Sequence, residues 1–106
     1  MNNTQKMKRD FRKSKIWKAL RHKKNVEQNG IDPITKKKLL KYCNLHHLDL
    51  DEKNYTHLDN EDNFVLLNKQ THECLHFLYR YYCKDKDILE RFRYYLDLMC
   101  EINGDN

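Results

Sequence analysis

Hydrophobic side chains recur at helical spacing near the start of the chain, among many lysines and arginines. They are Phe11, Ile16, Trp17 and Leu20. This spacing predicts a basic amphipathic helix over residues 7–28, after a polar and frayed start at residues 1–6. Asn29-Gly30 is a helix stop signal, and Asp32-Pro33 predicts a turn.

The middle of the chain predicts two strands with a loop between them. Residues 39–50 have the apolar content of a strand, whereas residues 51–62 lack periodicity and are rich in acids and amides, which is typical of a loop. Residues 64–67 form an apolar run of strand length. Asn68 or Thr71 could then cap a helix that continues to about residue 83.

A last helix is predicted over residues 85–102, opened by Asp85 or Asp87 and ended before Gly104. We expect its apolar stripe and the tyrosines of the two final helices to face the core. The stripe comprises Ile88, Leu89, Phe92, Leu96 and Met99, and the tyrosines are Tyr79, Tyr81, Tyr82, Tyr94 and Tyr95. With no internal repeat and no linker, the order of elements predicts one α+β domain over residues 1–106.

Positive charge is concentrated in the first two fifths of the chain. Residues 1–42 contain fourteen Lys or Arg and three acids, a balance of +11, against +5 for the whole chain. A concentrated basic segment suits contact with a polyanion, because neutralising phosphates releases condensed counterions. A solvated lysine-rich face is the alternative explanation of a basic run.

The cysteines form no C-x-x-C pair of the kind that builds a zinc knuckle. The sequence contains neither an apolar stretch of membrane-spanning length nor the hydrophobic region of a signal peptide. We therefore expect reduced, buried thiols in a cytoplasmic protein without membrane contact. The four cysteines, to which no chemical role is assigned, are Cys43, Cys74, Cys83 and Cys100.

Two pairs of histidines stand out by their spacing. His72 and His76 are four residues apart on a predicted helix, so both imidazoles project from one face and could bind one ion. Alone, such a pair is more often surface decoration. The doublet His46-His47 lies in a predicted strand, where neighbouring side chains face opposite ways. One of these histidines can therefore face a metal while the other points to a different part of the site.

This arrangement resembles the ββα-metal motif, or His-Me finger, of HNH endonucleases. The matching residues are Leu45-His46-His47-Leu48, Asn63 with the apolar run at 64–67, and the pair His72 and His76. The interval from Asn63 to His72 and the His-x-x-x-His ending suit the version used by nuclease colicins. The match also extends upstream, to the series Phe11-Arg12-x-Ser14-x-x-Trp17-x-x-x-Arg21, which is similar to a helix that precedes the motif in many small, often phage-borne, members.

The resemblance implies a ββα-metal core at residues 39–83, between a basic N-terminal helix and a C-terminal helix. It also implies a DNA endonuclease that leaves 5′-phosphate and 3′-hydroxyl ends. Such proteins are often phage products, acting in the host cytoplasm as homing-type nucleases or within a larger phage nuclease or packaging complex.

The resemblance assigns a role to each matched residue. His46, His72 and His76 would hold one divalent metal ion, His47 would be the general base, and Asn63 would orient that base by tying the loop to the backbone. A neutral imidazole, with an ordinary pKa of about 6.5, can accept a proton from water near physiological pH. The basic residues expected to contact DNA phosphates are Arg9, Arg12, Lys13 and Arg21.

One departure from the family concerns structural zinc. Many relatives bind it through two cysteine pairs, but this chain has Asn68 and Thr71 where the second pair would fall, and Asp32 near the first. We therefore expect no structural zinc, and the final helix is the expected substitute source of stability. Three imidazoles suit Zn²⁺, Ni²⁺, Co²⁺ or Mn²⁺ better than Mg²⁺, although Mg²⁺ supports catalysis in many family members.

Two other functions stay open from the sequence. One is a non-catalytic nucleic-acid-binding accessory module that keeps the fold and the metal. The other is a toxin-like nuclease that also degrades RNA, which the colicin-like ending keeps open. Among the remaining candidates, we expect His22 and His57 to be surface residues and Trp17 to belong to the core.

Overall fold

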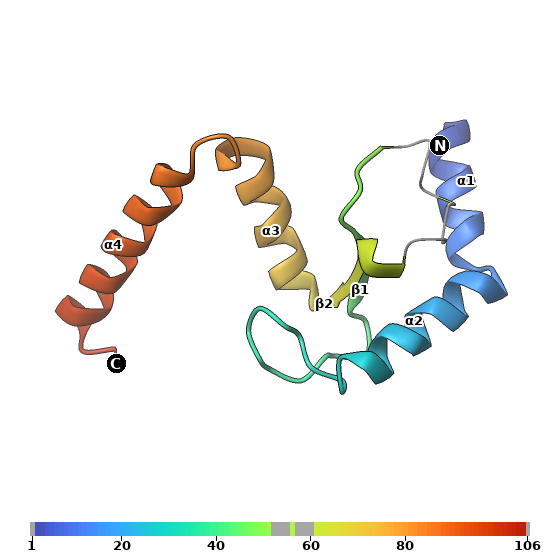
Figure 1. Cartoon of the computed structure of the whole chain (residues 1–106), viewed down its shortest axis with the longest axis horizontal. Coiled ribbons are helices and arrows are strands. Elements are labelled where there is room, and N and C mark those ends of the chain that lie inside the picture. The colour runs from blue at the N-terminus through green and yellow to red at the C-terminus, as the bar shows by residue number, and fades with distance from the viewer. Residues whose placement is uncertain (1, 52–55, 57–60, 106) are drawn as a thin grey trace. The chain divides into compact units, whose positions relative to one another are not determined.

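A computed structural model describes residues 2–51, 56 and 61–105 of the chain. Within these ranges the elements are four α-helices, a short 3-10 helix and a two-stranded antiparallel sheet, so the predicted α+β class is confirmed (Figure 1). The chain divides into two compact units, Met1–His72 and Glu73–Asn106, and each is described by itself. The assignment of residues 1–106 to a single domain stays a prediction.

The amino-terminal segment contains two helices, α1 (Asn3–Arg12) and α2 (Lys15–Glu27), where the sequence predicted one. The prediction of a single helix over 7–28 was wrong because Ser14 begins a new helix: its hydroxyl accepts a hydrogen bond from the Trp17 backbone N–H at 3.2 Å. The expected fraying of residues 1–6 was also wrong from residue 2 onward. Asn2 caps α1 through a capping box, which satisfies backbone donors at the start of that helix.

The sheet pairs β1 (Asn44–His47) with β2 (Phe64–Leu67), and His46 lies opposite Val65. The second strand is where it was predicted, but β1 is much shorter than residues 39–50. A turn precedes it, closed by a 3.1 Å hydrogen bond from the Cys43 N–H to the Leu40 carbonyl. Four apolar residues of the predicted strand are therefore exposed, namely Leu40, Tyr42, Leu48 and Leu50. Most of the loop predicted over 51–62 lies outside the described residues.

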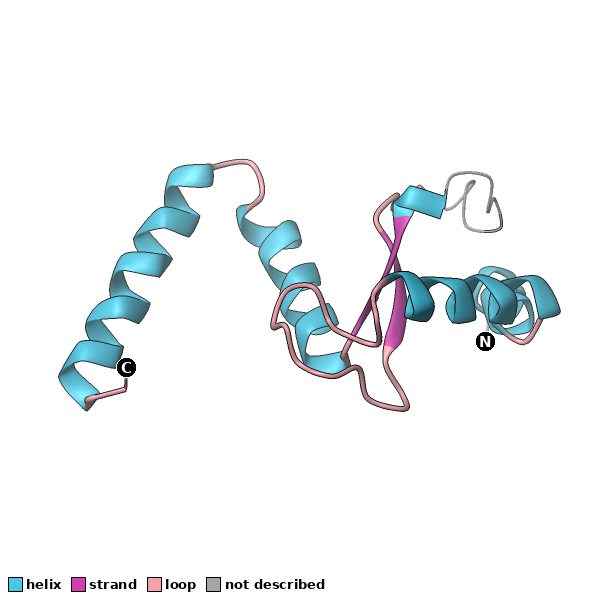
Figure 2. Cartoon of the chain, turned by 60° about the horizontal axis from the view of Figure 1, so that its bottom comes forward, coloured by secondary structure: helices cyan, strands magenta, loops and turns pink. Residues whose placement is uncertain are grey.

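The core of the first unit lies where α2 packs against the sheet (Figure 2). Trp17 belongs to this core, as predicted. Removing this much aromatic and aliphatic surface from water is the main driving force for the unit's folding. Its buried members are Trp17, Leu20, Leu39, Leu45, Phe64 and Leu66.

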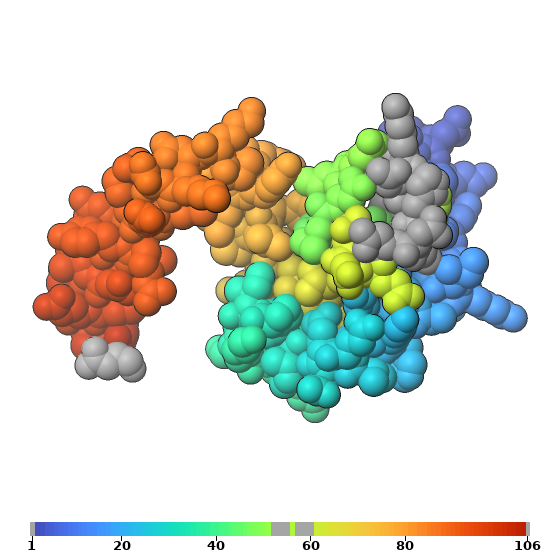
Figure 3. Space-filling view, viewed as in Figure 1, coloured from blue at the N-terminus to red at the C-terminus, as the bar shows by residue number. Residues whose placement is uncertain are grey.

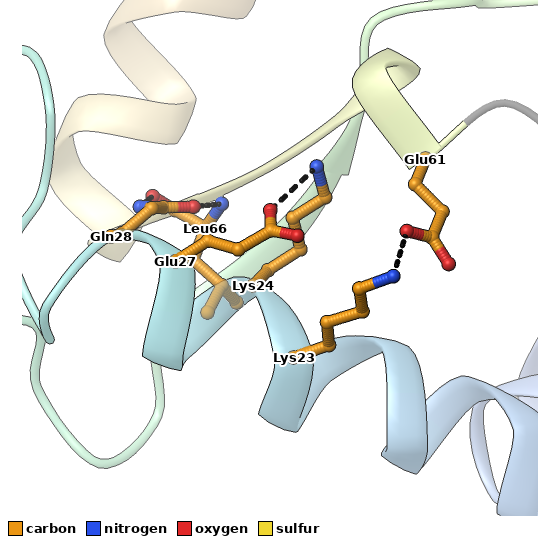
Figure 4. Close-up of polar contacts among 6 residues, drawn as sticks. All are labelled: Lys23, Lys24, Glu27, Gln28, Glu61 and Leu66. Carbon is orange, nitrogen blue, oxygen red and sulfur yellow. Dashed lines mark hydrogen bonds and ion pairs between the residues drawn. The ribbon is translucent and has the colours of Figure 1, made fainter.

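Polar side chains at the end of α2 fasten this helix to the strand and to the segment before it (Figure 4). The Gln28 amide donates to the Leu66 carbonyl at 2.9 Å and accepts from the Leu66 N–H at 2.8 Å, so it covers the outer edge of β2. Lys23 pairs with Glu61, which begins the 3-10 helix η2 (Glu61–Asn63). This hydrogen bond, and then the opposite charge of Glu61, raise the pKa of Lys23.

The helix α3 (Lys69–Tyr82) begins in the first unit and continues through the second, where α4 (Lys86–Asn103) follows it. Asp85 caps α4, and Gly104 ends it with a left-handed φ of 70°, in agreement with the predicted boundaries. The expected burial of its apolar stripe was wrong, because Leu89, Phe92, Leu96 and Met99 are exposed and Ile88 is only half-buried. Figure 3 shows the side chains of this helix in space-filling form, in orange to red.

The tyrosines and cysteines of the second unit are also more exposed than predicted. Tyr82 packs edge-on against Phe92 with ring centroids 5.0 Å apart, but Tyr79, Tyr81, Tyr94 and Tyr95 are exposed. All four thiols are free, and those of Cys74, Cys83 and Cys100 are exposed rather than buried. Helical periodicity predicts an apolar face without saying what covers it. Among the described residues, no helix has the length and apolar character needed to cross a membrane.

Candidate metal centre

Three histidines predicted as metal ligands lie together in the structure, and we call them the histidine cluster (His46, His72 and His76). His46 is buried on β1, and its Nδ1 lies 3.0 Å from Nε2 of His72 in the first turn of α3. His76 follows one turn later on the same continuous helix, which fixes its place relative to His72. One ring nitrogen from each histidine lies within 4.8 Å of the other two.

The cluster fits a single metal ion. Nitrogen ligands at about 2.0–2.1 Å from a tetrahedral ion lie about 3.4 Å from one another. The observed separations, 3.0 Å for one pair and at most 4.8 Å for all three nitrogens, approach this geometry. Imidazole donors suit Zn²⁺, Ni²⁺ and Mn²⁺, whereas Mg²⁺ prefers oxygen.

Asn44 joins the cluster, although no motif pointed to it. Its Nδ2 lies 3.1 Å from Nδ1 of His72, the ring nitrogen that does not face His46. Asn44 and His46 are two residues apart on β1, so their side chains share one face of the sheet. This two-residue spacing is the signal that could have revealed Asn44 once the strand register was known.

His47, the predicted general base, contacts a different part of the molecule. Its ring stacks on Trp17 with centroids 5.4 Å apart and packs at an angle against Phe64 at 4.6 Å. The side chain is half-buried. The two aromatic contacts fix the orientation of the His47 ring. His46 and His47 therefore lie in different surroundings, as strand geometry predicts for neighbouring residues.

Asn63 ends η2, immediately before β2. Its backbone carbonyl accepts a 2.8 Å hydrogen bond from the N–H of Leu48, the residue after His47. The main chain of Asn63 therefore helps to hold the strand that carries the histidine doublet. The orienting role of its side chain stays a prediction.

A buried carboxylate lies at one of the positions where the family resemblance would place zinc-binding cysteines, and we call its surroundings the Asp32 cluster (Asp32, Ile34, Thr35, Asn68 and Thr71). One carboxylate oxygen accepts from the backbone N–H groups of Ile34 at 2.8 Å and Thr35 at 3.2 Å. The other accepts from the Asn68 N–H at 3.0 Å. The Thr71 side chain adds a further hydrogen bond. Hydrogen bonds thus join the three residues that stand in place of zinc-binding cysteines, namely Asp32, Asn68 and Thr71.

The ionisation of Asp32 reflects two opposing effects. Its side chain is 0% exposed, and this burial favours the neutral acid. The hydrogen bonds from Asn68, Ile34, Thr35 and Thr71 favour the carboxylate and together outweigh burial, so the pKa of Asp32 lies below its ordinary value. The charged form is therefore the one built into the fold.

The predicted DNA-contacting residues differ in their surroundings. Arg9, Arg12 and Lys13 are exposed, and Arg9 lies 3.4 Å from the carboxylate of Asp10. Arg21 is half-buried and donates to the sulfur of Cys43 at 3.3 Å. Phosphate contact by these four residues stays a prediction. His22 is exposed, as expected, whereas His57 lies outside the described residues.

No family model, curated protein or solved structure matches this chain. The features that bear on function are therefore the histidine cluster, the surroundings of His47 and the distribution of charge.

Proposed function

We propose that this protein is a metal-dependent endonuclease of the HNH type, which hydrolyses DNA phosphodiester bonds to 5′-phosphate and 3′-hydroxyl ends. The observation that carries the proposal is the histidine cluster, formed by one residue of an antiparallel hairpin and two of the helix that follows it. The order β1, β2, α3 supports assigning residues 39–83 to a ββα-metal core. The adjacent His47 supplies the base that hydrolysis requires.

His46, His72 and His76 would hold one divalent ion, from the group Zn²⁺, Ni²⁺, Mn²⁺ and Mg²⁺. When bound, such an ion acts as a Lewis acid on the phosphate and neutralises charge on the leaving oxygen. No structural zinc is needed in this proposal, because Asp32 and its hydrogen-bond donors already join Asn68 and Thr71 to the preceding loop.

In the proposed reaction His47 takes a proton from a water molecule as the water oxygen attacks phosphorus. The bond from phosphorus to the 3′ oxygen then breaks, and this oxygen leaves with a proton from solvent as a hydroxyl. Trp17 and Phe64 hold the His47 ring in place, so little orientational freedom has to be lost before the transition state.

The basic amino-terminal helices provide the surface for DNA. Arg12 ends α1 and Lys13 follows it, both exposed where the chain turns into α2. The balance of +11 over residues 1–42 favours binding of the phosphate backbone, with an affinity that falls as salt rises. Backbone contacts of this kind carry no sequence information directly, so we expect weak sequence preference.

One observation also favours a second candidate, a nucleic-acid-binding module with no catalytic activity. Because His47 packs on Trp17 and Phe64, its ring could serve packing alone. Such a module would bind DNA in a salt-dependent manner and leave the strands intact.

Relaxation of a supercoiled plasmid tests the proposal with each of the four ions in turn. We expect nicking by the wild-type protein and its loss in His47→Ala. His22→Ala is the matched control, because His22 is an exposed histidine on α2, and it should cut normally. An intact plasmid under all four ions, or undiminished cutting by His47→Ala, would contradict the proposal. Salt-dependent binding without cutting would establish the non-catalytic module.

A further inference from the structure

Asn44, His72 and His46 form a chain of two hydrogen bonds. The Asn44 Nδ2 lies 3.1 Å from His72 Nδ1, and His72 Nε2 lies 3.0 Å from His46 Nδ1. Both ring nitrogens of His72 are therefore engaged, one by an amide and one by the neighbouring imidazole. His72 and Asn44 are half-buried and His46 is buried, so these contacts are partly shielded from water.

The direction of this chain follows from the chemistry of its first member. An amide NH₂ group can only donate hydrogen bonds, so Nδ1 of His72 accepts from Asn44. A neutral imidazole carries one proton, which must then lie on Nε2, from where it is donated to His46 Nδ1. In this arrangement a proton joins the two facing nitrogens of His46 and His72.

A metal ion between the same two nitrogens requires the opposite tautomer of His72. Nε2 must then offer a lone pair, so the ring proton moves to Nδ1 and needs an acceptor. The amide of Asn44 has such an acceptor in its Oδ1, which rotation of the amide by about half a turn presents to the same ring nitrogen. The Asn44 side chain can thus stabilise the His72 tautomer that binds metal.

We propose that Asn44 is a positioning residue for His72: its amide oxygen accepts the Nδ1–H of the ring and so favours the tautomer whose Nε2 binds metal. This inference rests on the proposed function only in taking the histidine cluster as a metal site. Ligand histidines commonly donate their second N–H to such a partner, which fixes the ring and raises its basicity.

Substitutions at residue 44 test the role of the amide oxygen. Asn44→Asp offers only acceptors, so it favours the Nδ1–H tautomer of His72 whether or not metal is present. Asn44→Leu has a similar volume but neither a donor nor an acceptor. Asn25→Leu is the matched control, since Asn25 is exposed on α2.

The experiment measures zinc affinity by competition with a chromophoric chelator, together with the ¹⁵N NMR shifts of the His72 ring. We expect zinc to bind Asn44→Leu about 10- to 100-fold more weakly than the wild type, and Asn44→Asp about tenfold more tightly. In the zinc-bound wild-type protein the His72 ring proton should lie on Nδ1. In Asn44→Asp it should lie on Nδ1 with and without zinc.

Equal zinc affinity of the wild type and Asn44→Leu would overturn the inference, as would a His72 ring proton on Nε2 in Asn44→Asp. Absence of zinc binding by the wild type would also overturn it. The proposed nuclease function fails in a different way. If zinc binds most tightly to Asn44→Asp, less tightly to the wild type and most weakly to Asn44→Leu while plasmid DNA stays intact, the inference stands and the nuclease does not.

Discussion

The Asp32 cluster and the histidine cluster each include a residue from the first turn of α3. They differ in the groups that contact their polar atoms. In the Asp32 cluster, N–H and O–H groups of the chain bind both oxygens of a fully buried carboxylate. In the histidine cluster, ring nitrogens lie 3.0 Å apart in one pair and within 4.8 Å overall. Thr71 of the Asp32 cluster and His72 of the histidine cluster are adjacent residues in one turn of α3.

This difference indicates a division of work between the two clusters. Hydrogen bonds to a buried anion are about twice as strong as those between neutral groups, so the Asp32 cluster mainly stabilises the fold. A hydrogen bond between uncharged groups contributes about 1 kcal/mol to stability, so contacts among the three histidines alone would stabilise the fold only slightly. In the proposed function, the histidine cluster gains further stabilisation from the metal ion that it binds.

The largest expected effect separates these two residues of α3. His72→Ala removes a proposed ligand, and we expect DNA cleavage to fall about a thousandfold, because a catalytic ion contributes several kcal/mol to transition-state stabilisation. Thr71→Ala removes the hydroxyl bonded to Asp32 and a buried methyl group but no proposed ligand, so cleavage should persist while stability falls by about 2 kcal/mol. Plasmid relaxation rates and urea denaturation measure the two effects. Equal losses of activity in both variants would show that the clusters are not distinct.

The converse substitution should affect stability rather than metal binding. Asp32→Ala leaves the backbone N–H groups of Ile34, Thr35 and Asn68 without their acceptor, so we expect the free energy of unfolding to fall by about 3 kcal/mol. Urea denaturation measures this loss. Asp10→Ala is the control, because Asp10 is an exposed acid on α1. A loss no greater than that of the control would show that the Asp32 cluster is dispensable.

Features encoded by neighbouring residues could be predicted from the sequence. Asp85 and Gly104 are cap residues whose preference depends on local backbone geometry, and both ends of α4 lie where they were expected. The spacing of His72 and His76 places them on one helix face in the same way. Their meeting with His46 followed from a family resemblance, and the hairpin that brings them together has a register that hydrophobic patterning alone does not specify.

Features that depend on tertiary contacts could not be predicted. Ser14 is a local exception: its hydroxyl caps α2 by accepting from the Trp17 N–H three residues later, but the apolar spacing runs across Ser14 and hides the break between α1 and α2. Asn44 and His72 are 28 positions apart in sequence. They come into contact only because the hairpin places Asn44 beside the first turn of α3. The exposed stripe of α4 shows the same limit, because Leu96 and Met99 have helical periodicity but no cover within their unit.

Adding metal should sharpen the contrast by stabilising one cluster alone. At a free zinc concentration of one hundred times Kd, a single site stabilises the folded state by about 2.7 kcal/mol. We expect this gain in the wild type and in Asp32→Asn, but not in His46→Ala. Urea denaturation with and without zinc measures it. If Asp32→Asn lost the zinc effect while keeping its fold, the two clusters would be coupled through the first turn of α3.

The smallest expected effect is the pH dependence contributed by Asp32. Its pKa is lower in the folded state than the value of about 3.9 typical of unfolded chains, so the unfolded state takes up a proton first as the pH falls. The stabilisation is therefore complete well above pH 4 and declines as the pH falls from there through the folded-state pKa. Asp32→Asn lacks this proton linkage, so its stability should fall less steeply over the same window. Urea denaturation between pH 2.5 and 6 compares the two slopes. Parallel slopes would mean that the pKa of Asp32 is the same in the folded and unfolded states, so its hydrogen bonds would not favour the carboxylate and the contrast between the two clusters would be wrong.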